Sequence, residues 1–279
     1  MYKKSLIIIL IALLILPMAT AEFYPAIDSD FIDASDYPNY PWAAVIKYTQ
    51  QENIVIEGKT IHNAPYFGIF IKNCVNVTIS NCSFYNIQSS AICIKYCDHV
   101  NVYNNTVIKS CMNKDQEGIS LQDCNKFKVY NNTIIDCHKE GIDAKSGSNN
   151  GSIYNNIVVN SKDARPGIYV DAFEDNTINV TVAKNILLGT GQGISLATES
   201  GGSLKDIAVK FNYVIVDSNA FSIHRYNNPG SNKKENLLIT NNLFISNEAR
   251  SLHITDHPSN FLNLRILQNM NVGPTVWVP

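Results

Sequence analysis

The chain has 279 residues, of which 45% are hydrophobic and 16% are charged, and its formal net charge at pH 7 is −2. That length permits one or two globular domains. The nearly balanced charge does not provide the strongly basic face that nucleic-acid binding needs, so the sequence predicts no nucleic-acid partner.

Residues 1–21 have the parts of a secretory signal peptide. Lys3 and Lys4 form a basic start, an apolar run follows, and the sequence ATA at 19–21 suits cleavage before Glu22. The alternative is an uncleaved anchor, although the apolar run is short for a complete membrane span. We expect cleavage, a secreted or cell-surface protein, and no membrane association afterwards.

Residues 22–47 precede the regular pattern of the chain. We expect this segment to form a short N-terminal cap, because the end of a solenoid must cover its apolar face and its strand edge. Residues 48–279 are then expected to form a single repeat domain.

The repeat domain is built from one recurring phrase. A strand centred on Asn, such as VYNNTV at 102–107, is followed about a dozen residues later by a Gly-Ile strand, such as GISLQ at 118–122. The Gly-type positions are Gly68, Ala91, Gly118, Gly141, Gly167, Gly193, Ala220 and Ser251. A regular period with variable insertions is typical of a solenoid.

The repeated segments are short β-branched runs of alternating polarity, such as NVTI and FKVY, separated by turn residues. Such runs predict strands rather than helices. Parallel pairing between successive coils would stack each Ile and Val column on itself. We therefore predict an all-β, single-domain parallel solenoid of about 8–9 coils, with function on stacked columns of side chains.

An asparagine column runs through the repeats. Its members are Asn105, Asn132, Asn156, Asn185, Asn212, Asn242 and Asn269. Asn tolerates left-handed backbone geometry, and stacked Asn side chains can bond to one another. We interpret the column as structural, and occupancy of some of its NNT glycosylation sequons is the alternative.

The seven cysteines are many for an exported protein. Cys74, Cys97 and Cys124 each lie six residues after a Gly-type position, so they should stack in one column. Adjacent coils about 4.8 Å apart are within disulfide range. Because free cysteine packs as a hydrophobic residue, we favour buried thiols and leave one or two disulfides open.

The pattern resembles the right-handed parallel β-helix superfamily, the pectate-lyase-like fold. The stretch 140–202, which includes EGIDAKSGS and GIYVDAF, looks like part of exported bacterial and archaeal β-helix repeat proteins. The resemblance implies a right-handed helix and action on polysaccharides, and methanogen disaggregatases are relatives to consider at the level of fold. The fold also hosts epimerases, phage spikes and adhesins, and no known catalytic signature of a pectate lyase or polygalacturonase aligns.

Outward-facing residues are the candidates for chemistry. The second and fourth residues after each Gly-type position should point outward, since strand residues alternate. Asp143 and Asp171 are one coil and two residues apart, which gives a Cα separation of about 8 Å, compatible with the acid and base of an inverting glycoside hydrolase. We also expect Lys145 beside Asp171 to lower the pKa of that carboxyl group.

An elimination is the other candidate chemistry. Lys145 would act as its base, and His224 completes the candidate catalytic set with Asp143 and Asp171. The candidate substrate-binding residues are Tyr169, Arg165, Glu199, Arg225 and Tyr226. We predict no metal and no cofactor. Because the nearby carboxylate oxygens could bind Ca²⁺, a Ca²⁺ site is the alternative.

The leading hypothesis is an exported polysaccharide-degrading enzyme, a lyase or an inverting glycoside hydrolase. Polar outward positions with Asp beside Lys are also ordinary in a sheet, so a non-catalytic cell-surface, adhesin or glycan-binding protein is the alternative. His253, Asp256 and His257 offer few ligands for a metal site. A role in copper-site maturation would need Met or His clusters, but Met112 and Met270 are isolated.

Overall fold

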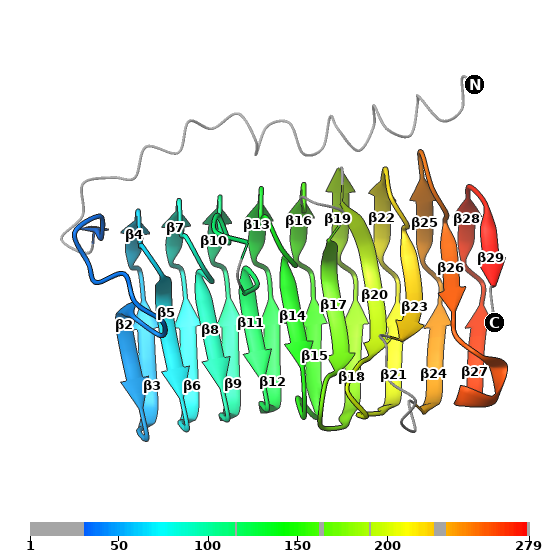
Figure 1. Cartoon of the computed structure of the whole chain (residues 1–279), viewed down its shortest axis with the longest axis horizontal. Helices are drawn as coiled ribbons and strands as arrows, with labels where there is room; N and C mark the ends of the chain where they lie inside the picture. Colours follow the sequence, from blue (N-terminus) through cyan, green and yellow to red (C-terminus); the bar gives the residue numbers. More distant parts are fainter. Residues whose placement is uncertain (1–30, 115, 162–164, 190, 226–232, 278–279) are drawn as a thin grey trace. The chain divides into compact units, whose positions relative to one another are not determined.

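The computed structural model describes residues 31–279 apart from 115, 162–164, 190, 226–232 and 278–279. The predicted signal peptide and residues 22–30 of the predicted cap lie outside the described residues. The unit Ile32–Pro279 is compact. Its strands form three parallel sheets of 10, 10 and 9 strands within the described ranges, and each sheet takes every third strand of the chain (Figure 1). The prediction of an all-β parallel solenoid is confirmed.

Sheet A contains the short strands that follow the Asn column. Its strands are β1 (Phe31–Asp33), β4 (Thr60–His62), β7 (Ser83–Tyr85), β10 (Thr106–Ile108), β13 (Thr133–Ile135), β16 (Ile157–Val159), β19 (Ile186–Gly189), β22 (Tyr213–Val216), β25 (Leu243–Ser246) and β28 (Met270–Val272).

Sheet B contains the Gly-Ile strands of the repeat. Its strands are β2 (Ala44–Thr49), β5 (Phe67–Lys72), β8 (Ile92–Lys95), β11 (Ile119–Gln122), β14 (Ile142–Lys145), β17 (Pro166–Ala172), β20 (Gln192–Thr198), β23 (Phe221–Arg225), β26 (Leu252–Thr255) and β29 (Thr275–Trp277).

Sheet C contains the strands that lead into the Asn column. Its strands are β3 (Glu52–Glu57), β6 (Val75–Ser80), β9 (Asp98–Tyr103), β12 (Asn125–Tyr130), β15 (Gly151–Tyr154), β18 (Thr177–Ala183), β21 (Leu204–Lys210), β24 (Lys234–Thr240) and β27 (Phe261–Leu267). A 3-10 turn, η1 (Pro258–Asn260), precedes β27. The described part of the chain has no helix with the length and apolar character to cross a membrane.

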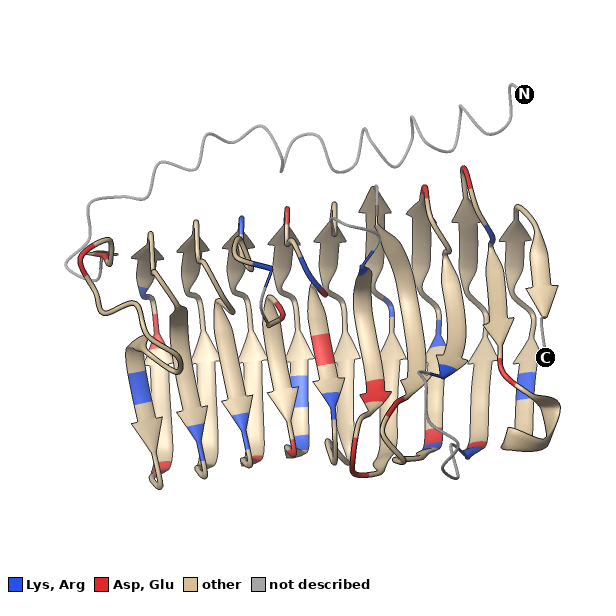
Figure 2. Ribbon diagram, in the orientation of Figure 1, with Lys and Arg blue, Asp and Glu red and all other residues tan. Residues whose placement is uncertain are grey.

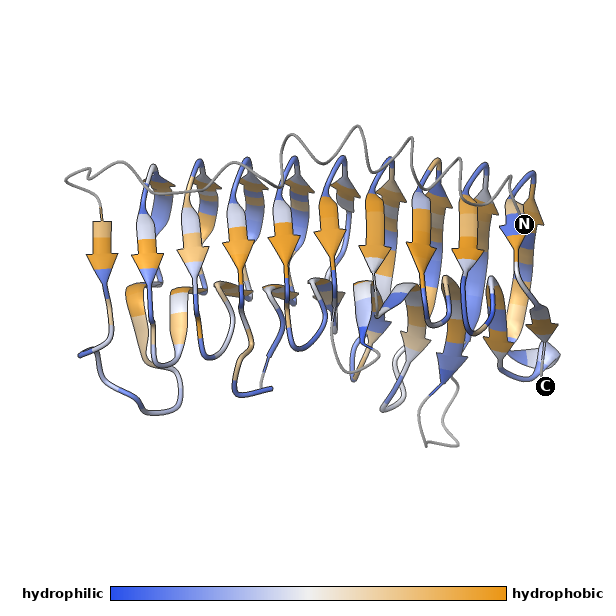
Figure 3. Cartoon of the chain, turned by 90° about the horizontal axis from the view of Figure 1, so that it is seen from above, coloured by the Kyte–Doolittle hydropathy of each residue, from blue (hydrophilic) through white to orange (hydrophobic). Residues whose placement is uncertain are grey.

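The core lies inside the coil between the three sheets. All strands except β28 and β29 contribute apolar residues to it, and these residues recur at the same place in successive coils (Figure 3). Gly141 and Gly167 show how tightly the coils stack, because a Cβ atom on Gly141 would lie 2.6 Å from the carbonyl oxygen of Gly167. Strands β14 and β17 pair in parallel at this point, as the repeat predicts.

The Asn column forms a continuous buried ladder. Each Nδ2 group donates to the Oδ1 atom of the next Asn, as from Asn132 to Asn156 and from Asn156 to Asn185, at 3.0 Å in both cases. The ladder residues from Asn105 to Asn242 are buried, and the left-handed backbone geometry falls on the preceding residue, such as Asn131 or Asn155, with a φ of 55°. The structural interpretation of the column is therefore confirmed.

All seven cysteines are buried thiols that form no disulfide. The Cys97 Sγ atom accepts a hydrogen bond from the Cys74 backbone, so the predicted column forms. Burial raises the pKa of the Cys97 thiol to about 12. The described part of the predicted cap includes β1 and the start of β2, which pairs in parallel with β5. Its role in capping stays a prediction.

Candidate active site

The outer face of sheet B carries the candidate catalytic side chains. Residues of each strand alternate between core and exterior, so Ile142 and Ala144 belong to the core while Asp143 and Lys145 do not. Strand pairing places Asp143 opposite Tyr169 on the next coil. The predicted outward columns are therefore present in β14 and β17.

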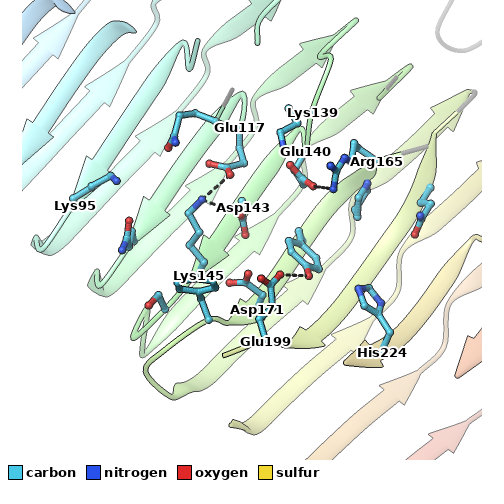
Figure 4. Close-up of a pocket in the computed structure, with 17 residues that line it drawn as sticks. Lys95, Glu117, Lys139, Glu140, Asp143, Lys145, Arg165, Asp171, Glu199 and His224 are labelled. Atoms are coloured by element: carbon cyan, nitrogen blue, oxygen red, sulfur yellow. Dashed lines mark hydrogen bonds and ion pairs between the residues drawn. The ribbon is translucent and has the colours of Figure 1, made fainter. Parts of the chain in front are cut away.

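A pocket of about 640 Å³ opens over this face, within the range of typical ligand sites (Figure 4). It extends across β8, β11, β14, β17, β20 and β23 and is bordered by the turns that precede β11 and β14. Seven predicted site residues line it, namely Asp143, Lys145, Arg165, Tyr169, Asp171, Glu199 and His224. We call this pocket the cleft.

The two aspartates of the cleft face outward yet are covered by their surroundings. Asp143 is 2% exposed and Asp171 is 3% exposed. The Oδ1 atom of each carboxyl group is buried and has no hydrogen-bond partner within the described ranges. Buried polar atoms are almost always satisfied in folded proteins. These two oxygens are therefore candidates to bind a group that enters the cleft.

Asp143 belongs to a network with Lys145 and Glu117. The Lys145 Nζ atom lies 2.6 Å from Glu117 Oε1 and 3.6 Å from Asp143 Oδ2. Burial, together with the nearby charge of Asp171, raises the pKa of Asp143 well above its ordinary value. Burial opposes the charge on Lys145, but Glu117 and Asp143 outweigh it and hold the pKa of Lys145 well above its usual range.

Glu117 is the counter-ion that holds Lys145 in place. Its other carboxylate oxygen accepts a 2.7 Å hydrogen bond from the hydroxyl of Ser120. Burial works against its charge, yet the pKa of Glu117 is lowered because Lys145 lies so close. Glu117 is thus a charged group fixed within the cleft wall.

Asp171 and Glu199 both line the cleft and lie beside each other (Figure 4). Burial raises the pKa of Asp171 well above its ordinary value, and the charge of Glu199 adds to this effect. Glu199 accepts a 2.8 Å hydrogen bond from the Tyr169 hydroxyl. The charge of Lys145 lowers the pKa of Asp171, as expected, but burial and Glu199 outweigh this effect. The expectation that Lys145 would favour the charged form of Asp171 is therefore wrong.

His224 and Arg165 complete the lining. The imidazole ring of His224 stacks on Tyr169 with centroids 6.0 Å apart. Burial, helped by the charge of Lys234, lowers the pKa of His224 to about 4, so the ring is neutral at physiological pH. Arg165 lies 3.5 Å from Glu140 Oε1.

Two predicted binding residues are not part of the described cleft. Arg225 does not line it, and its Nε atom lies 3.8 Å from Asp256 Oδ1. The reason is strand alternation: His224 faces the cleft, so the next residue points elsewhere. Tyr226 lies outside the described residues.

A metal site is not apparent in the described ranges, where no group of three or more His, Cys, Asp or Glu side chains is arranged to hold an ion. In the group considered for such a site, Asp256 binds Lys234 Nζ at 2.5 Å in a buried ion pair. His253 contacts Asn219, and His257 contacts Ser259.

The sequence analysis did not single out Glu117 and Glu140. Both line the cleft, and each directly precedes a glycine of the repeat, in QEGIS and KEGID. This repeated Glu-Gly-Ile phrase was the available signal. Glu140 is buried, burial raises the pKa of its carboxyl group, and Glu117 adds to that shift.

Comparison with known families agrees with the geometry. The family model described as right handed beta helix region matches residues 37–179, just over half of the chain. The chain belongs to the right-handed β-helix family. The right-handed parallel β-helix that the resemblance implied is thereby confirmed.

More distant comparisons add less to this family assignment. A search of curated proteins finds no match. Among solved structures, the tailspike gp61 of the Pseudomonas phage phi297 is similar to this β-helix, with a TM-score of 0.42 and 14% identity over 77% of this chain and 47% of the tailspike. The chain thus spans about half the length of that tailspike. A similarity of this size says nothing about what this β-helix binds.

Proposed function

We propose that this β-helix protein is an exported glycoside hydrolase that cleaves a polysaccharide in the cleft. The observation that carries the proposal is the pair of buried aspartates on adjacent strands, Asp143 and Asp171, each with a raised pKa and an unpartnered oxygen. Hydrolysis of a glycosidic bond needs one carboxyl group that keeps its proton and a second group that accepts one.

Asp143 suits the role of the acid. Its raised pKa favours the protonated form, and Lys145 lies on the Oδ2 side while Oδ1 has no partner among the described residues. In the reaction, protonated Asp143 donates its proton to the glycosidic oxygen as the bond from that oxygen to the anomeric carbon breaks.

The Asp171 and Glu199 pair suits the role of the base. Burial and the charge of Glu199 raise the pKa of Asp171, so its carboxylate binds a proton more readily than an exposed aspartate does. The hydrogen bond from Tyr169 orients Glu199. The pair accepts a proton from water as the water oxygen bonds to the anomeric carbon, and exchange with solvent restores both groups.

The state of Lys145 favours hydrolysis over elimination. A lysine acts as a base only after it loses its proton, and the neighbouring carboxylates hold the pKa of Lys145 well above its usual range. Lys145 is therefore better suited to positioning Asp143 than to removing a proton from a sugar.

Substrate groups would meet aromatic and cationic side chains at the rim. Phe173 lines the cleft and is 39% exposed, so its ring is available to pack against a sugar. The Arg165 side chain, 42% exposed, is available to bind a polar substituent. Together with the predicted signal peptide, these features support an extracellular polysaccharide as the substrate.

The test is a comparison of the wild-type chain with the Asp143→Asn and Asp171→Asn variants on a panel of polysaccharides. Reducing ends report hydrolysis, and ultraviolet absorbance of unsaturated products reports elimination. We expect wild-type activity without that absorbance, and a loss of at least about 100-fold in each variant. Asp206→Asn, an exposed substitution on sheet C, is the matched control.

Each other outcome has a defined meaning. Full cleavage by a folded Asp143→Asn, Asp171→Asn double variant would overturn the assignment. Absorbing products would replace hydrolysis by elimination. Binding of a glycan by the wild-type chain without any product would favour the non-catalytic glycan-binding protein.

A further inference from the structure

The N-terminal half of the cleft face carries a row of lysines. Lys47, Lys72 and Lys95 lie on β2, β5 and β8, and these strands are marked by blue segments in Figure 2. Lys72 and Lys95 occupy directly paired positions on adjacent strands. The same register continues from Lys95 to Gln122 and from Gln122 to Lys145.

These lysines are not neutralised by ion pairs among the described residues. None of Lys47, Lys72 and Lys95 forms an ion pair in the described part of the protein. Like charges at directly opposite positions destabilise a sheet. The pairing of Lys72 with Lys95 is therefore not explained by the stability of sheet B and leaves a place for an external anion.

Aromatic rings surround the same lysines. The Nζ atoms of Lys95 and Lys47 lie 4.3 Å and 5.4 Å from the ring centroids of Trp42 and Phe70, respectively. Trp42 and Phe70 are themselves in contact, with centroids 5.7 Å apart. Trp42 remains 42% exposed. Rings that combine exposed apolar surface with nearby cations can hold a sugar by packing while the cations bind its charged groups.

The backbone at Trp42 is held in an unusual conformation. Its φ of 68° lies in the left-handed region, which is uncommon for a bulky residue and occurs where surrounding contacts over-determine it. The Lys47 ammonium group donates to the Trp42 carbonyl oxygen at 3.2 Å. Lysine and tryptophan thus hold each other on this face.

Lys95 connects this surface to the cleft. It lines the cleft, and it also lies over the ring of Trp42. A polymer leaving the cleft toward the N-terminus would therefore cross β8, β5 and β2 in turn. The strand spacing of about 4.8 Å is close to the length of one sugar unit, so successive units would meet successive lysines.

We propose that Lys72, Lys95 and Trp42 form a subsite for negatively charged sugar units, and that the substrate is an acidic polysaccharide bearing carboxylate or sulfate groups. This inference rests on the proposed function, because it extends the same cleft. Its chemistry is recognition by charge-assisted hydrogen bonds from lysine and by packing on an aromatic ring.

The experiment measures binding of the full chain to polygalacturonate, alginate and chondroitin sulfate by affinity electrophoresis. Methyl-esterified polygalacturonate, which lacks the negative charges, is the neutral control for polygalacturonate. The Lys72→Gln, Lys95→Gln variant removes two charges from the row. Lys126→Gln, Lys128→Gln removes two exposed charges from sheet C and is the matched control. The Asp143→Asn variant reports on cleavage.

We expect the wild-type chain to bind at least one acidic polymer, with affinity that falls as salt is added. The Lys72→Gln, Lys95→Gln variant should lose about tenfold in affinity or more, while the control keeps it. Since the substitution relieves repulsion between like charges, the variant should fold. Circular dichroism checks that it does.

Equal binding by wild type and the Lys72→Gln, Lys95→Gln variant would overturn the subsite, as would binding of neutral polymers alone or of no acidic polymer. The proposed function fails separately. If Asp143→Asn cleaves normally while the lysine variant loses binding, the catalytic assignment is wrong and the subsite stands. If Asp143→Asn binds but does not cleave, and the lysine variant binds normally, only the subsite is wrong.

Discussion

The Lys145 Nζ atom and the Glu117 Oε1 atom lie 2.6 Å apart and join the end of β14 to the turn before β11. The two residues are 28 positions apart in the chain. Because Lys145 also lies 3.6 Å from Asp143, Glu117 controls how strongly the lysine acts on the candidate acid.

Glu117→Gln should move the pH dependence of cleavage. The charge of Glu117 raises the pKa of Asp143, whereas Lys145 lowers it. Removing the Glu117 charge and freeing Lys145 should therefore lower the pKa of Asp143. Since the acid works only when protonated, the alkaline limb of the rate profile should shift to lower pH. Initial rates across the pH range measure this shift.

The exposed Glu57→Gln substitution on sheet C is the matched control and should leave the profile unchanged. An unshifted alkaline limb in Glu117→Gln, with the fold intact, would show that Asp143 is not the titrating acid.

Asp171→Asn should stabilise the protein at alkaline pH. Burial and Glu199 raise the pKa of Asp171 above the unfolded value, so the folded state keeps a proton that the unfolded state releases. The free energy of unfolding of the wild type therefore falls as the pH rises from about 4 toward the folded pKa. The Asn variant lacks this loss and should therefore be the more stable protein at pH 8, by at least about 1 kcal/mol.

Thermal unfolding of both proteins at pH 4 and pH 8 provides the measurement. The advantage of Asp171→Asn should be largest at pH 8, and Asp206→Asn should show no such trend. A wild-type protein that is the more stable of the two at pH 8 would contradict the raised pKa of Asp171.

The sequence repeat was sufficient to predict the register of the coils. The spacing from Gly141 to Gly167 placed β14 beside β17, and alternation then put Asp143 and Asp171 on one outer face. These features follow from the period of the backbone, which the sequence displays directly. Arg225 does not reach the cleft, because its parity along β23 differs from that of His224.

The side chains that border the cleft could not be predicted from the period of the repeat. Glu117 and Glu140 belong to turns of different lengths, so the repeat does not define the direction of their side chains. The burial of Asp171 depends on its neighbours across several coils. The register made Lys145 its expected partner, but the lysine instead binds Glu117, and Glu199 approaches Asp171.

Asn156→Ala should destabilise the β-helix by about 2–4 kcal/mol. The Asn156 Nδ2 group donates to the carbonyl oxygen of Val129 at 2.9 Å and to Asn185 Oδ1 at 3.0 Å, and its Oδ1 atom accepts from Asn132. Alanine removes these buried hydrogen bonds, and the backbone N–H of Asn132 also loses its acceptor, Asn156 Oδ1. Denaturant unfolding measures the loss.

Asn271→Ala on β28, where the residue is exposed, is the control and should change stability by less than about 0.5 kcal/mol. Equal stability of Asn156→Ala and the wild type would mean that the ladder is not a source of stability.

The cysteines should stay reduced and unreactive in the folded protein. All seven are buried, and burial raises the pKa of Cys124 as well as that of Cys97, which suppresses the reactive thiolate. Titration with an aromatic disulfide reagent should therefore detect almost no thiol in the native state and all seven after denaturation. The sulfur atoms of Cys111 and Cys137 lie 3.3 Å apart, so this pair is the candidate for oxidation to a disulfide. Two thiols fewer after denaturation, restored by a reductant, would show that the pair is oxidised and would contradict the buried-thiol interpretation.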